Sequence, residues 1–596
     1  MRKQMVTMVF LALCLLVLSS CQGARRAVSP KLCDVRLEEG EGFCPRRSIV
    51  TVRSGETAVF LLRPDPGYHF ASVDYEQASV ETWGGEQRLS LFDVRDSVTV
   101  HVSYEPGERQ IQYFGSGALT KEGKESLYLS VPDGKLRGNT SQGTNMFSRN
   151  GYTLYAWNTK ADGSGERIGL GSRIEVTKEG RQLYAMWQKW SDESLFETLE
   201  DEEGFLTLTG YVGEEDTLCI PSEIGGRPVK SIAPDAFAGL KSQTVILPPS
   251  LREIGAGAFY GADLKTLYLF DSLTHLDPLA FLECQALSTI HLNAATAPRF
   301  MTYFATFADK HDRLLSLKGE PKIVLFSGSS GRFGFDCPLL EESIPEYQFV
   351  NMGVFAYTNA RPQMEIILSC MEEGDVLVHM PEFDASNYQF CTNNTLSHTL
   401  FCMMEANYDE LSLLDLRTYD NVIPALSAYL SIRVGVEEGS YAFSPSDFDE
   451  DGNPSSVPTY NAWGDYVLPR PNAAQDAPIY GLPVRYTVEA FESEPFAESI
   501  NAVYDRFLDE GIRVYFSYAP RNAKALSIDS TEEELENLNA WFGRMLHARV
   551  ISDIEESLYS GIYMYGTDNH LSTEGVKIRT ERMISDLQKA LLEENE

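Results

Sequence analysis

The apolar residues of the chain change their spacing from one stretch to the next. Between residues 47 and 105, short runs alternate apolar and polar positions, as in Ser48–Val52, Thr57–Pro64 and Ser97–Tyr104, with Gly, Pro and Asp residues between them. A period of two places one face of a strand against a core and the other in water. We therefore predict a small all-β module over residues 47–105.

A second β module is predicted over residues 106–190. Its most informative stretch carries Gly151 and Tyr152, Trp157, the turn Asp162–Gly165 and the closing run Leu183–Trp187. This pattern resembles the internalin-type B repeat, and the resemblance implies a β-grasp-like fold that acts as a spacer or an adhesive unit. We interpret its aromatic residues as core rather than as a platform for a ligand.

Residues 204–293 repeat themselves. Ala-Phe pairs begin at Ala236, Ala258 and Ala280, a period of 22 residues, and an apolar run follows each pair. A fixed period of this length predicts a solenoid, because each unit can bury its apolar edge only against its neighbours. The units resemble BspA-type leucine-rich repeats. Repeats of this kind act as binding surfaces or as rigid connectors, and the sequence leaves both roles open.

The pattern changes again after a predicted polar hinge near residues 294–320. Over residues 320–596, buried runs that suit strands alternate with amphipathic helical stretches. Such alternation predicts a parallel sheet with helices on both faces, a three-layer α/β domain. The stretch 435–481 is rich in Pro, Ser, Asn and aromatic residues and is interpreted as an insertion. Its Tyr460, Trp463 and Tyr466 either form a substrate lid or pack against the domain.

The first 21 residues combine a basic start with an apolar run of about a dozen residues, which is typical of a secretory signal. The run ends in Leu18-Ser19-Ser20-Cys21, which resembles the bacterial lipobox. That resemblance implies that Cys21 carries a lipid anchor, and residues 22–46 are predicted to be a tether. We therefore expect an exported lipoprotein held at the cell surface.

Composition excludes one class of partner. The 86 acidic and 50 basic residues give a net charge of −36, which disfavours binding to nucleic acid. The cysteines show no CxxC spacing that would hold zinc, and the acidic turn at 447–452 has Pro458 where a calcium loop needs glutamate. We expect no metal and no cofactor. Cys33 and Cys44 could form a disulfide or remain thiols.

The candidate chemistry begins at Lys322–Asp336, an apolar run that ends in Gly328-Ser329-Ser330. With a glycine and an aspartate following, this turn resembles the first motif of the SGNH or GDSL-like hydrolases. The resemblance implies that Ser330 is the nucleophile and that its backbone N–H belongs to the oxyanion hole. A serine hydroxyl needs a neighbouring base, because it is a weak nucleophile at neutral pH.

The loop Thr567–Gly575 precedes the last predicted helix and is similar to the closing motif of that family. The resemblance makes His570 the base and Asp568 the residue that orients it. The family spaces this pair as D-x-x-H, whereas the residue three before His570 is Thr567. The role of Asp568 is therefore open.

The resemblance also implies that Gly353 donates an N–H to the oxyanion hole. The asparagine of the family's third motif is absent near residues 376–386. His379 and Glu382 would then line the pocket, or His379 would be an ordinary core histidine.

Two functions follow from these patterns. The first is a surface lipoprotein whose SGNH-like domain is a serine esterase or acyltransferase, acting on O-acyl groups of extracellular or cell-wall glycans. The second is a non-catalytic adhesin that binds a glycan or surface protein through its repeats and keeps a degenerate SGNH fold.

Overall fold

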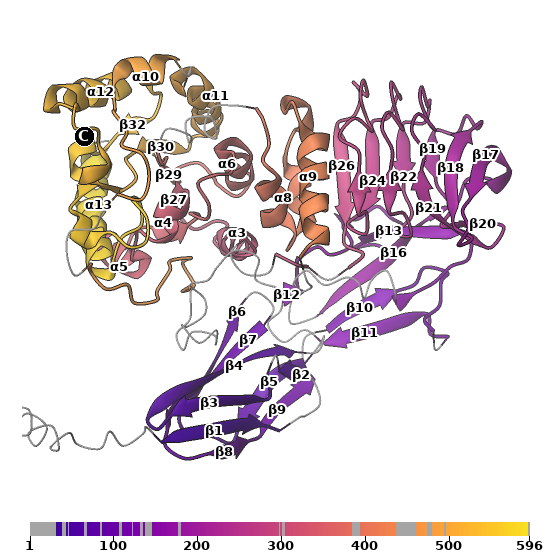
Figure 1. The fold of residues 1–596 in the computed structure, drawn as a ribbon, viewed down its shortest axis with the longest axis horizontal. Helices are drawn as coiled ribbons and strands as arrows, with labels where there is room; N and C mark the ends of the chain where they lie inside the picture. Colours follow the sequence, from indigo (N-terminus) through magenta and orange to yellow (C-terminus); the bar gives the residue numbers. More distant parts are fainter. Residues whose placement is uncertain are drawn as a thin grey trace, which may run out of the picture.

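A computed structural model describes residues 31–593, apart from 39–42, 46, 65–67, 84–85, 107–109, 122, 131–134, 137–145, 177–179, 297, 301–303, 384–393, 437–459, 474–478 and 494–495. Cys21 and the acidic turn at 447–452 therefore lie outside the described residues. The repeats and the C-terminal domain stand side by side, with α8 (His398–Met404) and α9 (Val422–Val434) between them, and the β modules lie below (Figure 1).

The first β module comprises β1 (Leu32–Leu37), β2 (Phe43–Pro45), β3 (Ile49–Arg53), β4 (Glu56–Pro64), β5 (Tyr68–Val73), β6 (Ala78–Trp83), β7 (Glu86–Val94), β8 (Val98–Val100) and β9 (Val102–Pro106). They form sheets ordered β3-β1-β8, β2-β4-β7-β6 and β5-β9. Strands β1 and β2 lie within the predicted tether 22–46, so the module begins earlier than predicted. The reason is packing, since alternate residues of β1 are buried, and Cys33 among them is a free thiol.

The second β module has a five-stranded sheet ordered β11-β10-β16-β13-β14. Its strands are β10 (Gln110–Phe114), β11 (Ser126–Ser130), β13 (Tyr152–Asn158), β14 (Arg167–Ile168) and β16 (Arg181–Lys189), beside a small pair of β12 (Lys135–Leu136) and β15 (Ile174–Glu175). Strand β10 runs parallel to β16, and the other pairs of the larger sheet are antiparallel. Trp157 is buried against Tyr113 and Phe147, which places these aromatic residues in the core.

The repeats stack into two parallel ladders, β18-β21-β23-β25 with β17 at the end, and β19-β22-β24-β26. Their strands are β17 (Phe196–Glu200), β18 (Leu206–Tyr211), β19 (Thr217–Cys219), β20 (Glu223–Ile224), β21 (Arg227–Ile232), β22 (Thr244–Ile246), β23 (Glu253–Ile254), β24 (Thr266–Phe270), β25 (His275–Leu276) and β26 (Thr289–Asn293). Phe237, Phe259 and Phe281 stack with ring centroids 5.2 and 4.8 Å apart. The 22-residue period is thus the sequence spacing that stacks the phenylalanine ring of each unit on the ring of the next.

The C-terminal domain contains a five-stranded parallel sheet ordered β28-β27-β29-β30-β32. Its strands are β27 (Lys322–Ser327), β28 (Gln348–Asn351), β29 (Val376–Met380), β30 (Arg513–Phe516) and β32 (Arg549–Val550). Its helices are α3 (Thr306–Ser316), α4 (Ser329–Arg332), α5 (Cys337–Ser343), α6 (Ala360–Leu368), α8 (His398–Met404), α9 (Val422–Val434), α10 (Val488–Ser493), α11 (Phe496–Asp509), α12 (Glu532–Met545) and α13 (Thr573–Glu593).

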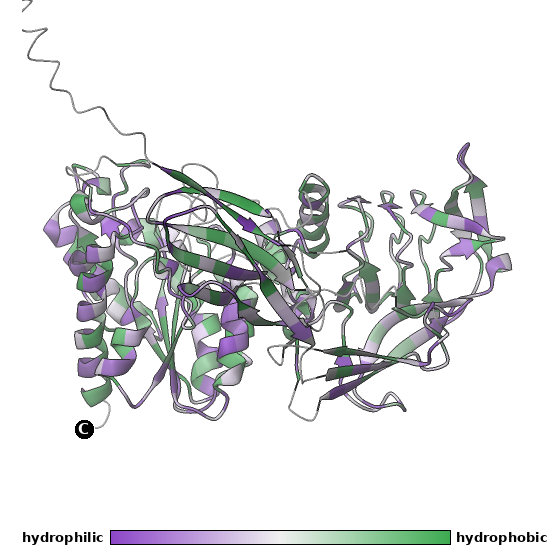
Figure 2. Cartoon of the chain, turned by 90° about the horizontal axis from the view of Figure 1, so that it is seen from below, coloured by the Kyte–Doolittle hydropathy of each residue, from purple (hydrophilic) through white to green (hydrophobic). Residues whose placement is uncertain are grey.

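Helices cover both faces of this sheet. Along β27, Ile323 and Leu325 pack into a core with α5 and α13, whereas Val324 and Phe326 pack into a core with α6, α11 and α12. Every residue of β27 is buried, and alternate residues point into the two cores, as expected for the central strand of the predicted three layers. In Figure 2 the outer helices alternate between hydrophilic purple and hydrophobic green, as expected for helices with one face in water.

The repeats and the C-terminal domain share one hydrophobic core. Phe300, Phe304, Phe307 and Leu314 belong to it together with residues of both regions. The stretch predicted as a polar hinge at 294–320 therefore contains the packed helix α3, and that prediction was wrong. The buried phenylalanines at its start explain why the chain does not hinge there.

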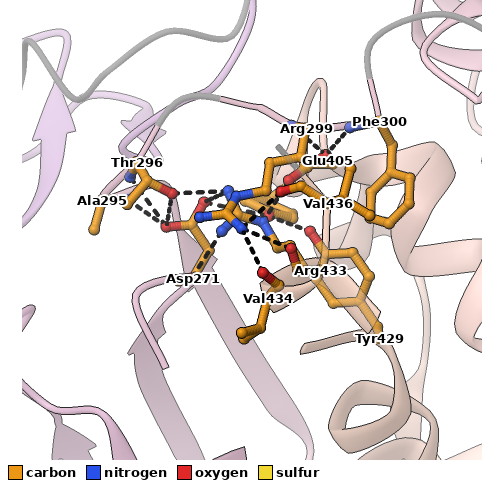
Figure 3. Close-up of polar contacts among 11 residues, drawn as sticks. Asp271, Ala295, Thr296, Arg299, Phe300, Glu405, Tyr429, Arg433, Val434 and Val436 are labelled. Carbon is orange, nitrogen blue, oxygen red and sulfur yellow. Dashed lines mark hydrogen bonds and ion pairs between the residues drawn. The ribbon is translucent and has the colours of Figure 1, made fainter. Parts of the chain in front are cut away.

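Helix α9 and the end of α8 close the last repeat (Figure 3). Arg433 lies between two carboxylates, with Nη2 2.9 Å from Asp271 Oδ2 of the repeats and Nε 2.5 Å from Glu405 Oε1. Glu405 also accepts the backbone N–H groups of Arg299 and Phe300. We call Asp271, Glu405 and Arg433 the junction cluster. It is deeply buried, and each carboxylate accepts several hydrogen bonds.

The second β module is fixed to the same region. Arg173 contacts Asp309 and Asp312 of α3 at 2.9 and 3.0 Å, and Asp409 contacts Arg167 at 3.1 Å. Asp409 lies in the 3-10 helix η3 (Tyr408–Leu413). These charged contacts join the second β module to α3 and η3.

Among the described residues, none of the helices combines the length and the apolar composition that crossing a membrane requires.

Candidate functional site

The turn that holds the predicted nucleophile, Gly328–Ser330, lies at the carboxyl end of β27. The strand ends at Ser327, Gly328 follows, and Ser329 is the first residue of the short helix α4. A Cβ at Gly328 would lie 2.6 Å from Ala356 Cα and 2.7 Å from Glu382 Oε1. Only glycine therefore allows the turn to approach both neighbours so closely.

Ser329 faces the histidine of the C-terminal loop. The Ser329 Oγ and His570 Nε2 atoms are 2.9 Å apart, although the two residues are 241 positions apart in sequence. Burial, and then the nearby Arg470 and Arg332, lower the pKa of His570 to about 3. The imidazole is therefore neutral at pH 7, which is the form that can accept a proton from a serine hydroxyl.

The structure does not bring the predicted nucleophile Ser330 to His570. Ser330 Oγ lies 2.8 Å from Ser327 Oγ, whose own hydroxyl donates to the Met380 carbonyl at 2.6 Å. Ser330 therefore contacts the end of β27 from inside the domain, where it is 1% exposed. Successive helical residues point about 100° apart, so only one of two adjacent serines can face the histidine.

Asp568 does not orient His570. Its carboxylate accepts the N–H groups of Tyr480 and Gly481 at 3.1 and 2.9 Å, and the Asn522 amide at 3.4 Å. In the described part of the chain, no carboxylate is hydrogen-bonded to the Nδ1 atom of His570. Thr567 instead accepts the His570 backbone N–H at 3.0 Å and fixes the loop. The site is a serine–histidine pair without the predicted third member.

Both predicted oxyanion donors are already engaged. The Ser330 N–H donates to Glu382 Oε1 at 2.5 Å, and the Gly353 N–H donates to Asn351 Oδ1 at 3.0 Å. Glu382 thus contacts the nucleophile turn, as a pocket residue should. An ionised carboxylate at this position would repel a developing oxyanion.

His379 is close to the turn but faces another partner. Its Nδ1 lies 2.8 Å from the Tyr504 hydroxyl, and its ring stacks on Phe326. Burial lowers the pKa of His379 to about 3. It lines a small pocket with Glu382 and Gln363, beside the turn. Both predicted pocket residues are therefore found in one pocket wall.

The described part of the insertion packs behind the turn. The Asp465 carboxylate accepts from the Asn351 amide and the Cys337 N–H, both at 2.8 Å, and the Tyr466 N–H donates to the Arg332 carbonyl. Tyr466 is buried against Phe333, whose ring also contacts His570. These contacts favour packing of the aromatic residues at 460–466 against the domain over a role as a substrate lid.

A cationic layer lies behind the pair. The Arg470 guanidinium is buried over Phe333 and Tyr466, and burial lowers its pKa to about 10. Burial, and then Arg332, lower the pKa of Lys310 to about 7, and its ammonium donates to the Gly353 carbonyl. Arg470 and Arg332 add to the effect of burial in lowering the pKa of His570. Among the described residues, no group of three or more His, Cys, Asp or Glu side chains could hold a metal ion.

Comparison with known proteins identifies the repeats. Residues 221–304 match the family model described as BspA type Leucine rich repeat region, in 6 copies, which confirms that prediction. Residues of this chain are also 28% identical to a leucine-rich repeat protein of T. pallidum, over 23% of this chain and 61% of that one, with a TM-score of 0.17. A leucine-rich repeat protein from Bacteroides capillosus is 18% identical over 22% of this chain and 78% of that one, with a TM-score of 0.12.

A curated protein of Evansella cellulosilytica, described as a membrane protein, is 25% identical over 121 residues. The match covers 20% of this chain and 17% of that protein, so the chain spans well under two thirds of the relative it matches.

Ser329 is the residue in contact with His570 that the sequence pattern missed. A helix that begins directly after Gly328 places its first residue toward the C-terminal loop and its second toward the sheet. The residue that could have indicated this is Ser327. It is a third small polar residue beside the turn, and its hydroxyl pairs with that of Ser330 inside the domain.

Proposed function

We propose that the chain is a cell-surface leucine-rich repeat protein whose C-terminal domain is an SGNH-like serine esterase or acyltransferase. The observation that carries the proposal is the 2.9 Å contact between Ser329 Oγ and a neutral His570. A further support is its place at the carboxyl edge of a parallel sheet, where ligands of such folds bind. The substrate class is an O-acyl group on an extracellular or cell-wall glycan.

The chemistry runs through this pair. The Ser329 oxygen attacks the ester carbonyl and its proton moves to His570 Nε2, so that a new C–O bond forms. The bond to the sugar oxygen breaks, and the leaving hydroxyl takes the proton from His570. Water or a second sugar hydroxyl then attacks the acyl-enzyme, again with His570 as base, and frees Ser329.

The location rests on the N-terminal pattern. A lipid at Cys21, followed by about ten residues of tether, would hold the first β module close to a membrane surface. Replacing Cys21 with alanine should abolish incorporation of an alkyne-tagged fatty acid and release the protein from membranes. Unchanged incorporation in Cys21→Ala would reject the anchor.

A second candidate function is a non-catalytic binding protein. Two hydrogen bonds favour it. Asp568 accepts the Tyr480 and Gly481 N–H groups instead of orienting His570, and Glu382 accepts the Ser330 N–H that an oxyanion hole would need. Under this alternative the repeats supply the binding surface, and the C-terminal domain serves as their cap.

Turnover separates the two candidates. The purified full-length protein is incubated with O-acetylated glycans and released acetate is measured, with Ser329→Ala and Ser330→Ala as a matched pair. We expect loss of release in Ser329→Ala and retention within about tenfold in Ser330→Ala, since only Ser329 contacts the base. Absence of release in the folded wild-type protein, across acetylated and other acylated glycans, would favour the binding protein.

A further inference from the structure

A small pocket opens beside the nucleophile turn at the carboxyl ends of β27 and β29. Its wall combines the ends of both strands, the loop after β28 and the first turn of α6, and it includes Phe326, Gly328, Phe355, Gln363, His379 and Glu382. Gly328 directly precedes Ser329, and Glu382 contacts the Ser330 N–H. The pocket therefore lies beside the turn that carries Ser329.

The pocket is narrow. The space that the centre of a water-sized group can occupy is about 20 Å³. One water molecule needs about 10–15 Å³ by that measure, so the pocket has room for one or two non-hydrogen atoms. A long acyl chain does not fit, whereas the end of a two-carbon acyl group does.

One polar atom in the wall lacks a partner. The Gln363 side chain is 2% exposed and donates its Nε2 to the Asn359 carbonyl at 3.2 Å. Because that partner is an acceptor, the other amide atom is the oxygen. Within the described residues, this Oε1 atom has no hydrogen-bond partner. A buried acceptor without a donor is costly, so the pocket favours an occupant that brings one.

The other polar groups of the wall do not offer Gln363 a donor. The Thr358 hydroxyl is paired with Thr399 at 2.5 Å, and His379 Nδ1 is paired with Tyr504. Glu382 adds a carboxylate, whose Oε1 accepts from Ser330 N–H. Gln363 Oε1 and the Glu382 carboxylate are therefore acceptors in a wall that also contains apolar rings.

We propose that this pocket receives the acyl group of the substrate and selects a two-carbon acyl group that ends in a hydrogen-bond donor. The proposal rests on the esterase or acyltransferase function proposed above and names its acyl specificity. A hydroxyacetyl group would place a hydroxyl on Gln363 Oε1, and an aminoacetyl group would place an ammonium there and near Glu382. A plain acetyl group fits the space but leaves Gln363 without a donor.

The test compares four esters of one alcohol with the full-length protein: acetyl, hydroxyacetyl, aminoacetyl and butyryl. We expect kcat/KM for hydroxyacetyl or aminoacetyl to exceed acetyl by about five- to tenfold, the effect of one hydrogen bond. Butyryl should be the poorest. Gln363→Leu should reduce the ratio to about one. Whichever donor ester has the higher kcat/KM shows whether the pocket prefers a hydroxyl or an ammonium.

A binding measurement keeps this proposal separate from catalysis. In Ser329→Ala, hydroxyacetamide, aminoacetamide and acetamide are compared by ligand-observed NMR, with Gln363→Leu and Ala360→Val added in turn. We expect donor-bearing amides to bind more tightly, Gln363→Leu to remove that preference, and Ala360→Val to block all three. Equal binding of the three amides, as for a pocket that holds only water, would overturn the pocket proposal. Amide selectivity without ester turnover would instead overturn only the proposed function.

Discussion

The junction cluster and the Ser329 turn are both buried and polar, but their groups are paired in different ways. Arg433 is matched by two carboxylates, and Glu405 accepts two further N–H groups. At the turn, His570 has a hydroxyl on one side, and within the described residues it has no orienting carboxylate; the charges that act on it are those of Arg470 and Arg332. Complete pairing suits a junction that holds two regions together, whereas incomplete pairing leaves groups available for a ligand.

The largest effect should come from breaking the junction cluster. Arg433→Met leaves Asp271 and Glu405 buried without their cation, so we expect the free energy of unfolding to fall by about 3–5 kcal/mol. Arg417→Met is the control, because Arg417 is 65% exposed and pairs only with Asp415, and should cost at most about 1 kcal/mol. Chemical denaturation measures both. If both variants lost the same free energy of unfolding, the buried and the exposed ion pairs would not differ in their contribution to stability.

The next effect concerns the carboxylate at the turn. Glu382→Gln keeps an acceptor for the Ser330 N–H but removes the charge that faces a developing oxyanion. Ester hydrolysis should rise by about tenfold or more. The exposed Glu536→Gln on α12 removes the same charge far from the site and should leave the rate unchanged. A fall in the Glu382→Gln rate, with the fold intact, would show that the carboxylate assists the reaction.

A smaller effect is expected at Asp568. In a complete triad, losing the carboxylate costs about 10⁴-fold in kcat. Here Asp568 accepts the Tyr480 and Gly481 N–H groups, so Asp568→Asn should lower ester hydrolysis by less than about tenfold. Steady-state kinetics with one acetyl ester decides this. A loss near 10⁴-fold would return Asp568 to the role that the resemblance implied.

A pH effect is expected from His311 of α3, which lies between Glu410 and Cys370 at 2.8 and 3.2 Å. Burial opposes its charge, but Glu410 and the contact with Cys370 prevail and raise the pKa of His311 to about 10. Its contribution to stability is therefore fully present below about pH 6.5 and lost as the pH rises through about 10. Melting temperatures from pH 6 to 10 should fall in the wild-type protein and less steeply in His311→Gln. Parallel curves would contradict this.

The sequence predicted those features that depend on local periods. The repeats follow from a period of 22 residues, since stacking of Phe237, Phe259 and Phe281 requires equal spacing along the chain. The central strand β27 follows in the same way from its apolar run.

The features that the sequence did not predict depend on the exact residue at which a helix begins or on tertiary contacts. Choosing between Ser329 and Ser330 requires the residue at which α4 begins, which a motif does not specify. The direction of Asp568 depends on Tyr480 and Gly481, 87 or more positions away. The contact between Arg433 and Asp271 joins residues 162 positions apart, and no local period relates them.

The central claim is that Ser329 is a nucleophile activated by His570. The most direct measurement is reaction of the folded full-length protein with a fluorophosphonate, followed by mass-spectrometric mapping of the modified residue. We predict a single adduct on Ser329 that is retained in Ser330→Ala and lost in His570→Ala. An adduct on Ser330, or no adduct on a protein whose fold is intact, would contradict the account.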